Sequence, residues 1–550
     1  MITSPDPEPQ PEPRPAAAGS QADPPSAPPD AVAPQSDPPS APPDAAGSPA
    51  DPPSALPAAA AGLAATAAGI GVGHLVAAWI GASSSPVFAV SAAVVDRTPR
   101  WLKEFAIATF GTADKAVLLS VVAVVTLVLG GAAGVAQRRR PGLGVGIFGV
   151  LGLAAGWAAW SRPDAPPLAL IPTVLGVLVG IAALRWLTGR VRVPVAAELA
   201  SPPRRLLLGA TATTMLGGVA AGGLGQGRIS RATPGRTFAL PAPTSALPPL
   251  TSGLDVAGLT PWRTPVTDFF RIDTALTVPR IDAAQWRLTI DGDVENPLTL
   301  SYADLLELPM IEADITLNCV SNPVGGDYIG STRWLGTPVA ELLARVGIRA
   351  SADQFLTTSQ DGMTISVPVE ALTDPDRGAL LVVGMGGAPL TPAHGYPVRL
   401  LTPGLYGYVG ATKWLRRMTA TTYAAAPAYW SERGWAPRAA VQTQARIDVP
   451  RGKVSAGAVI VAGVAWSQAR RGITGVEVRV DDGPWEAATL GPDGGSVYWR
   501  QWTFTWAATE GEHRLTVRAT DGTGTVQTTQ VAPPAPSGAT GLHEVTVRVG

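Results

Sequence analysis

The sequence predicts a multi-domain chain: an α-helical membrane domain of about five spans, an α+β domain, and an all-β, immunoglobulin-like C-terminal sandwich. The length of 550 residues exceeds that of one ordinary domain. The hydrophobic content of 46% is concentrated in apolar stretches long enough to cross a bilayer. Short strands punctuated by turns fill the last part of the chain. The expected boundaries are 1–55 for a tail, 56–228 for the membrane domain, 229–261 for a linker, 262–425 for the α+β domain and 426–550 for the sandwich.

The first 55 residues are rich in Pro, Ala, Ser and Asp and contain a repeat. The sequence of residues 23–30 returns at residues 37–44, and a third copy begins at Asp51. A segment with so little bulky apolar surface cannot offset the entropy of ordering, so it predicts a disordered tail rich in polyproline II. An inert spacer is favoured over a partner-docking role.

The membrane domain is predicted from five apolar stretches of about 20 residues each. Arg138–Arg140 lie between the second and third stretches, and Arg190, Arg192, Arg204 and Arg205 lie between the fourth and fifth. Basic loops stay cytoplasmic, so we expect everything after the fifth span to lie outside. Residues 99–105 predict a helix at the membrane interface, anchored by Trp101. The predicted spans are roughly residues 57–81, 115–136, 142–161, 166–188 and 206–226.

Two features of this region have alternative interpretations. Arg204 and Arg205, followed by an apolar run, resemble a twin-arginine export signal retained as an anchor, or are ordinary topology charges. The spans contain one histidine, His74, so we expect no bis-histidine haem in this chain. For His74, burial between helices is favoured over a role in a membrane pathway.

The formal net charge of −1 argues against nucleic acid as a partner.

The middle of the chain mixes short strands with short helices, which is typical of an α+β domain. Strands are predicted at 286–290, at 379–383 and around the turn at Asp361-Gly362 within 355–368. Helices are predicted at 302–308 and 338–345, and a long Gly/Pro-rich stretch runs to Lys413. The C-terminal sandwich is predicted from strands at 459–464, 476–480, 502–506, 514–518 and 545–549.

Cys319 is the only cysteine in the chain and follows a short alternating pattern that predicts a strand. A Gly-rich turn, residues 322–326, comes directly after it. A lone cysteine is a buried small hydrophobe, a reactive thiol or a metal ligand. The local pattern leaves all three open.

The neighbouring motifs carry a resemblance. The Cys319 segment, Arg333-Trp-Leu-Gly336, His394-Gly-Tyr-Pro-Val-Arg399 and Lys413-Trp-Leu415 follow one another as in the sulfite oxidase family of molybdopterin enzymes. The resemblance covers roughly residues 262–550 and points to a membrane-anchored bacterial, actinobacterial-like form. It implies a molybdenum–molybdopterin cofactor with Cys319 as the thiolate ligand of the metal, and a dimerisation role for the sandwich. A soft thiolate suits such a metal, and Arg, Lys and backbone N–H groups suit a phosphate.

The resemblance also assigns roles to individual residues. The residues implied for catalysis are Cys319, Arg271 and Tyr429. The residues implied to bind the cofactor are Phe270, Arg271, Cys319, Ser359 or its neighbour Thr358, His394, Arg399, Ala411, Thr412 and Lys413.

Together with the predicted spans, the resemblance implies a membrane-anchored oxidoreductase that transfers an oxygen atom to or from a small, sulfur-containing substrate outside the cytoplasmic membrane. Sulfite oxidases of the family carry an Asn-Arg-Arg element soon after the cysteine, whereas here no arginine follows until Arg333. A less charged substrate than sulfite is therefore favoured. The alternatives are a sulfite oxidase proper, a sulfoxide reductase, or an exported immunoglobulin-like binding protein without catalysis. The electron partner is expected to be another protein or a quinone, since no cytochrome-type haem motif occurs.

Overall fold

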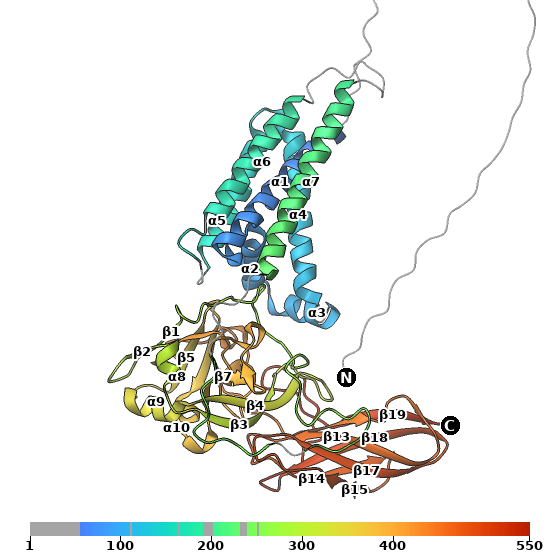
Figure 1. Cartoon of the computed structure of the whole chain (residues 1–550). Coiled ribbons are helices and arrows are strands. Elements are labelled where there is room, and N and C mark those ends of the chain that lie inside the picture. Colours follow the sequence, from blue (N-terminus) through green and yellow to red (C-terminus); the bar gives the residue numbers. More distant parts are fainter. Residues whose placement is uncertain (1–54, 111–112, 163–164, 191–201, 232–238, 250–251) are drawn as a thin grey trace, which may run out of the picture. The chain divides into compact units, whose positions relative to one another are not determined.

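The computed structural model describes residues 55–110, 113–162, 165–190, 202–231, 239–249 and 252–550 (Figure 1). The predicted tail lies almost entirely outside the described residues, as does Arg192. The described chain runs from a helical region through a mixed region to one made of strands.

Among the described residues, five helices are long and apolar enough to cross a membrane, and each coincides with a predicted span. Two further helices, α2 (Pro86–Arg97) and α3 (Arg100–Phe110), fall between the first two spans. The α3 helix includes residues 100–105 of the predicted interfacial segment, and Trp101 is largely exposed on it. The five long helices are α1 (Leu56–Ile80), α4 (Asp114–Arg139), α5 (Leu143–Trp160), α6 (Ile171–Arg190) and α7 (Pro202–Arg231).

Helix α1 packs against α4, α6 and α7, and its sequence explains why it can do so. A Cβ atom on Gly62 would lie 2.1 Å from the carbonyl oxygen of Gly130, and one on Gly71 would lie 1.9 Å from that of Gly218. Such close backbone approach requires glycine on both helices. His74 is buried in this bundle, with Nδ1 2.9 Å from Ser85 Oγ and Nε2 3.2 Å from Gln226 Oε1. The expectation of a buried histidine between helices is thus confirmed.

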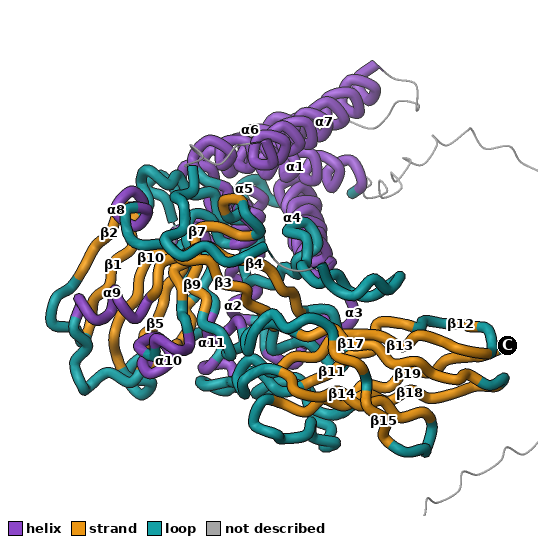
Figure 2. The backbone as a smooth tube through the Cα atoms, turned by 60° about the horizontal axis from the view of Figure 1, so that its bottom comes forward, coloured by secondary structure: helices purple, strands orange, loops and turns teal. Residues whose placement is uncertain are grey.

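Two five-stranded sheets form the α+β region (Figure 2). The first has the order β2-β1-β10-β5-β6, and β10 pairs in parallel with β1 and antiparallel with β5. The second has the order β3-β4-β7-β8, with β9 also paired to β7. The strands of the two sheets together are β1 (Arg287–Gly292), β2 (Leu298–Ser301), β3 (Ile311–Asn318), β4 (Ile329–Pro338), β5 (Gln354–Ser359), β6 (Thr364–Pro368), β7 (Leu380–Met385), β8 (Ala388–Pro389), β9 (Arg399–Leu401) and β10 (Leu415–Thr421).

Short helices connect these strands. Helix α8 (Tyr302–Leu306) begins with a capping box in which the Ser301 and Asp304 side chains each bond the other residue's backbone N–H. Helices α9 (Val339–Val346), α10 (Val369–Thr373) and α11 (Gly407–Gly410) follow. The helices at 302–308 and 338–345 are thereby confirmed to within two residues at either end.

The C-terminal region consists of two sheets, of order β11-β13-β17-β16 and β12-β19-β18-β14-β15. A core that includes Val461, Val478, Trp502 and Leu515 is fully buried among their strands. All five predicted strands of this region are present. They are β13 (Gly457–Trp466), β14 (Ile473–Val480), β17 (Arg500–Ala508), β18 (Gly511–Asp521) and β19 (His543–Val549), joined by β11 (Gln444–Val449), β12 (Lys453–Val454), β15 (Trp485–Ala487) and β16 (Thr489–Leu490).

Candidate functional site

Cys319 lies directly after the last residue of β3, where the strand opens into a tight loop. Its backbone N–H donates to the Tyr328 carbonyl at 2.9 Å, and its Sγ lies 2.9 Å from Ser321 Oγ. The side chain is half-buried. Burial raises the pKa of the thiol, while the Ser321 hydrogen bonds and the Lys413 charge act in the opposite direction. The sulfur therefore lies where β3 ends and a closed loop begins.

His394 lies in the turn before β9 and packs against an aromatic side chain. Phe269 meets the His394 ring edge-to-face at 5.8 Å and the Trp334 ring at 5.6 Å. The His394 Nε2 donates to the Val266 carbonyl at 3.2 Å, because a carbonyl can only accept. Burial, then the nearby charge of Arg399, lower the pKa of His394 to about 4. The imidazole is therefore neutral at pH 7 and keeps Nδ1 as an acceptor.

Arg399, the first residue of β9, is a buried guanidinium with few partners. The residue is 4% exposed, its Nη1 donates to the His394 carbonyl at 3.3 Å, and its Nε has no hydrogen-bond partner. Burial lowers its pKa to about 10, so the charge persists at neutral pH. No ion pair involves Arg399 within the described part of the chain. A buried cation without an anion is costly, which indicates that the site is built for an anionic ligand.

A second group of charges gathers at Asp273, whose side chain is 4% exposed. Lys413 Nζ lies 2.6 Å from Asp273 Oδ2, and Arg271 Nε lies 2.8 Å from the same oxygen. Burial alone would raise the pKa of Asp273, but the Lys413 charge and the Arg271 hydrogen bond hold it well below its usual range. Arg271 is exposed and Lys413 is mostly buried. The cluster holds two predicted cofactor-binding cations in fixed positions.

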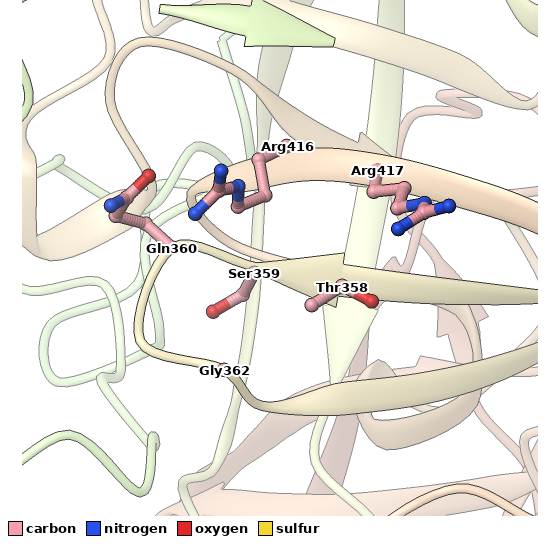
Figure 3. A pocket seen from close by; sticks show the side chains of 6 residues that line it. All are labelled: Thr358, Ser359, Gln360, Gly362, Arg416 and Arg417. Atoms are coloured by element: carbon pink, nitrogen blue, oxygen red, sulfur yellow. The ribbon is translucent and has the colours of Figure 1, made fainter. Parts of the chain in front are cut away.

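Ser359 forms part of the wall of a pocket of about 190 Å³ at the end of β5 (Figure 3). Arg416 and Arg417 line the same pocket, because a register shift between Leu415 and Arg417 leaves both arginines exposed on β10. Arg417 is paired with Asp291. The Ser359 hydroxyl donates to the Asp361 carboxylate. The arginines of this pocket were not predicted, and the Arg-Arg pair after Leu415 was the available signal.

The other predicted cofactor-binding residues lie around α11 and in the opening segment. Thr412 is fully buried, and its hydroxyl lies 2.6 Å from that of Thr357. The Ala411 N–H donates to Gly407 within the turn of α11. Phe270 stacks on Phe269 with ring centroids 5.3 Å apart. These contacts fix the segments that carry the predicted residues.

Tyr429 was predicted to be catalytic, and none of its described contacts is with Cys319, His394 or Arg399. Its N–H donates to Thr364 Oγ1 at 3.1 Å, and the Arg433 guanidinium lies 3.5 Å from its ring centroid. A different tyrosine, Tyr406, is buried and has its pKa raised to about 12, first by burial and in smaller part by nearby Cys319. The catalytic role of Tyr429 stays a prediction, and Tyr406 is a residue that the sequence did not single out.

Comparison with known proteins gives one domain match. Residues 275–430 match the family "Oxidoreductase molybdopterin binding domain". Mitochondrial sulfite oxidase of Macaca fascicularis is 29% identical over 309 residues, which cover 47% of this chain and 56% of that protein. The uncharacterized oxidoreductase YuiH of Bacillus subtilis is 29% identical over 182 residues, which cover 33% of this chain and 88% of that protein. The crystal structure of the sulfane dehydrogenase SoxCD from Paracoccus pantotrophus aligns with 52% of this chain and 81% of that chain, at 25% identity and a TM-score of 0.46.

The chain spans about half to two thirds of the length of the sulfite oxidases it matches. The residues present fit the cofactor of that family. Cys319 offers one soft ligand, and one thiolate leaves the other metal positions to the dithiolene of the cofactor. The buried Arg399 with its unpaired Nε offers charge to an anionic group. Residues 275–430 are therefore a molybdopterin-binding oxidoreductase domain, similar in sequence to that of sulfite oxidases.

Proposed function

We propose that this protein is a membrane-anchored enzyme that transfers an oxygen atom to or from a small sulfur compound outside the cytoplasmic membrane. The observation that carries the proposal is Arg399, a buried cation without an anionic partner among the described residues, in the same domain as the only thiol. The five apolar helices supply the anchor. The catalytic domain at 262–425 and an immunoglobulin-like domain at 426–550 follow them.

In this proposal Cys319 is the protein ligand of molybdenum, and the bound cofactor supplies two-electron redox chemistry with exchange of one oxygen atom. Arg399 and Lys413 hold the anionic and polar groups of the cofactor, with Phe270, Ser359, Ala411 and Thr412 at its edges. His394 presents a neutral acceptor nitrogen, Nδ1, toward a donor of the ligand. Arg271 and Tyr429 act on the substrate side.

The substrate that fits is neutral or singly charged, such as a sulfoxide. Two other arginines that could supply a positive charge to the substrate are already paired: Arg333 with Asp314 at 2.7 Å, and Arg500 of β17 with Asp493 at 2.9 Å. Arg271 is paired with Asp273. A dianion requires several fixed cations that are not already neutralised. The electron partner is a quinone or a separate protein, and the C-terminal domain is the surface for a homodimer.

Metal analysis tests the proposal directly. Protein purified from a host that makes molybdenum cofactor should contain about one molybdenum per chain, since one Cys319 is present. Elemental analysis by inductively coupled plasma mass spectrometry measures this, with Arg399→Met as the comparison. Losing the buried cation should reduce the metal content to less than about a tenth. Wild-type protein free of molybdenum from such a host would refute the proposed function.

Cofactor binding should depend on pH through Lys413. The pKa of Lys413 is lowered to about 8, first of all by burial. The charges of Arg399 and Arg271 also lower it, and Asp273 acts in the opposite direction. The ammonium charge is therefore present at pH 7 and lost as pH rises through about 8. We expect the affinity of the metal-free protein for molybdopterin to fall about tenfold between pH 7 and pH 9. In Lys413→Arg the affinity should stay nearly constant over this range, because arginine remains charged; an equal fall in both proteins would exclude Lys413 as the cause.

The proposed topology is tested with reporters. A periplasmic-active reporter fused after Gly550 should be active, and a cytoplasmic-active one inactive, because Arg138–Arg140 keep their loop inside. If export follows the twin-arginine route, Arg204→Lys with Arg205→Lys should leave the catalytic domain inside. Unchanged export in that double variant would show that these arginines are topology charges only. A reporter active only in the cytoplasm would contradict the topology itself.

A further inference from the structure

The C-terminal domain contacts the cysteine-bearing segment on both sides of Cys319. Before the cysteine, Thr316 of β3 donates its N–H to the Val497 carbonyl at 3.0 Å and accepts the Trp499 N–H on Oγ1 at 2.7 Å. The buried Gln468 donates Nε2 to the Thr316 carbonyl at 3.2 Å. Three hydrogen bonds from the C-terminal domain thus end on Thr316, which lies three residues before Cys319.

After the cysteine, the contact is made by a buried ion pair of β11. Arg446 Nε lies 2.7 Å from Asp448 Oδ1, and the two side chains are 8% and 1% exposed. The same guanidinium donates Nη1 to the Gly326 carbonyl at 2.7 Å and Nη2 to Thr260 Oγ1 at 2.7 Å. Arg446 therefore uses all three of its nitrogens in directed bonds, and one of them ends on the loop that follows Cys319.

His543 of β19 packs against the same loop at Gly325. A Cβ atom on Gly325 would lie 2.2 Å from His543 Cδ2, so the backbone of the loop runs directly against the imidazole. Gly325 has φ +76°, a conformation that glycine adopts without strain. The His543 Nδ1 accepts the Ile447 N–H at 3.0 Å, which fixes the ring. The loop is thereby confined between Arg446 and His543.

The loop itself transmits these constraints to the thiol, because its own hydrogen bonds tie residues 319–328 into one unit. The Cys319 N–H donates to the Tyr328 carbonyl, and the Asn322 N–H donates to the Cys319 carbonyl at 3.1 Å. The Tyr328 N–H donates to Asn322 Oδ1 at 2.9 Å, and the Gly326 N–H donates to the Pro323 carbonyl at 3.0 Å. These bonds connect Gly326 and Tyr328 to Cys319 through Pro323 and Asn322, so we expect a displacement of Gly326 to reach the thiol.

We propose that Arg446 and His543 are positioning residues for the metal ligand, so that the C-terminal domain is a structural part of the cofactor site. The inference rests on the proposed function only in assigning Cys319 to the metal. A thiolate must be held within a fraction of an ångström to suit a metal geometry, and a strand end followed by a Gly-rich turn does not provide this alone. Charge-assisted bonds from a rigid neighbouring sheet supply the missing constraint.

The single cysteine makes a direct test possible without activity. In metal-free, full-length protein, the rate of alkylation by N-ethylmaleimide reports how often residues 319–328 open. The double variant Arg446→Met/Asp448→Leu removes the ion pair without leaving a buried charge unpaired. We expect its alkylation rate to rise about tenfold or more, and that of His543→Ala to rise severalfold. The matched control is Arg518→Met/Glu477→Leu, an ion pair at 2.7 Å in the same domain without a bond to the loop, which should change the rate less than about twofold.

Folding of each variant is checked by circular dichroism and thermal melting. A folded Arg446→Met/Asp448→Leu protein with wild-type alkylation rate and wild-type hydrogen exchange of residues 319–328 would overturn the proposal. If that variant does not fold, hydrogen exchange in the wild-type protein decides. Amides of residues 319–328 should then open together with those of β11, and an independent, easier opening of the loop would overturn the proposal. Absence of molybdenum from the wild-type holoprotein would instead refute the proposed function and leave these rates interpretable.

Discussion

Cys319→Ala should abolish molybdenum binding and lower turnover by about a thousandfold or more, while the fold survives. The substitution removes the only thiol of the chain, and no other residue can provide a soft thiolate in its place. The side chain is half-buried at the end of β3, so its loss should change the free energy of unfolding by no more than about 1 kcal/mol. Molybdenum content, turnover with an artificial electron carrier and thermal melting are measured on the same preparation.

Ser321→Ala is the matched control for this prediction. It removes the hydroxyl that lies 2.9 Å from the sulfur but keeps the thiol, so we expect molybdenum to be retained and turnover to fall by about tenfold at most. Cys319→Ser should behave like Cys319→Ala, because an alcohol is a hard and weakly acidic ligand. Full molybdenum content with normal turnover in Cys319→Ala would show that the metal is held elsewhere.

Local sequence patterns predicted the helices and the C-terminal strands well. Membrane spans and alternating strands depend on composition within about 20 residues, and α1, α4, β14 and β19 are found where those patterns lie. By contrast, β4, β9 and β10 were not predicted, since their residues follow or interrupt Gly-rich and Pro-rich stretches. Their pairing is decided by other strands: β10 pairs with β1 and β5, β4 with β3 and β7, and β9 with β7. Strand propensity depends strongly on such context.

The candidate site likewise contains residues that a local motif could predict and contacts that only the fold creates. Cys319, His394, Arg399 and Lys413 could be named because they lie in motifs that resemble a known family. Asp273 could not, although it lies two residues from Arg271, because a sequence does not show that a carboxylate is buried among three cations, Lys115, Arg271 and Lys413. The contact of Arg446 with Gly326 joins residues 120 positions apart, which no local pattern can reveal.

Sulfite should be a poor substrate, with kcat/KM about ten- to a hundredfold or more below that of a sulfoxide. A dianion placed near an anionic thiolate and dithiolene requires fixed cations, and each charge-assisted contact contributes about 1.5–3 kcal/mol. The candidate cations are occupied: Arg271 by Asp273, Arg333 by Asp314, and Arg500 by Asp493. Loss of one such contact corresponds to about a ten- to hundredfold lower rate. Sulfite oxidation and sulfoxide reduction are compared with artificial carriers, normalised to molybdenum content.

The variant Asp273→Asn tests the cause of this preference. It removes the carboxylate that neutralises Arg271 and Lys413, so we expect kcat/KM for sulfite to rise about tenfold relative to that for a sulfoxide. Asp291→Asn is the matched control, because it releases Arg417 from a more exposed ion pair and should leave the ratio unchanged. Wild-type protein that oxidises sulfite with a higher kcat/KM than it shows for any sulfoxide would contradict the preference. A ratio unaffected by Asp273→Asn in molybdenum-loaded protein would show instead that Arg271 does not face the substrate.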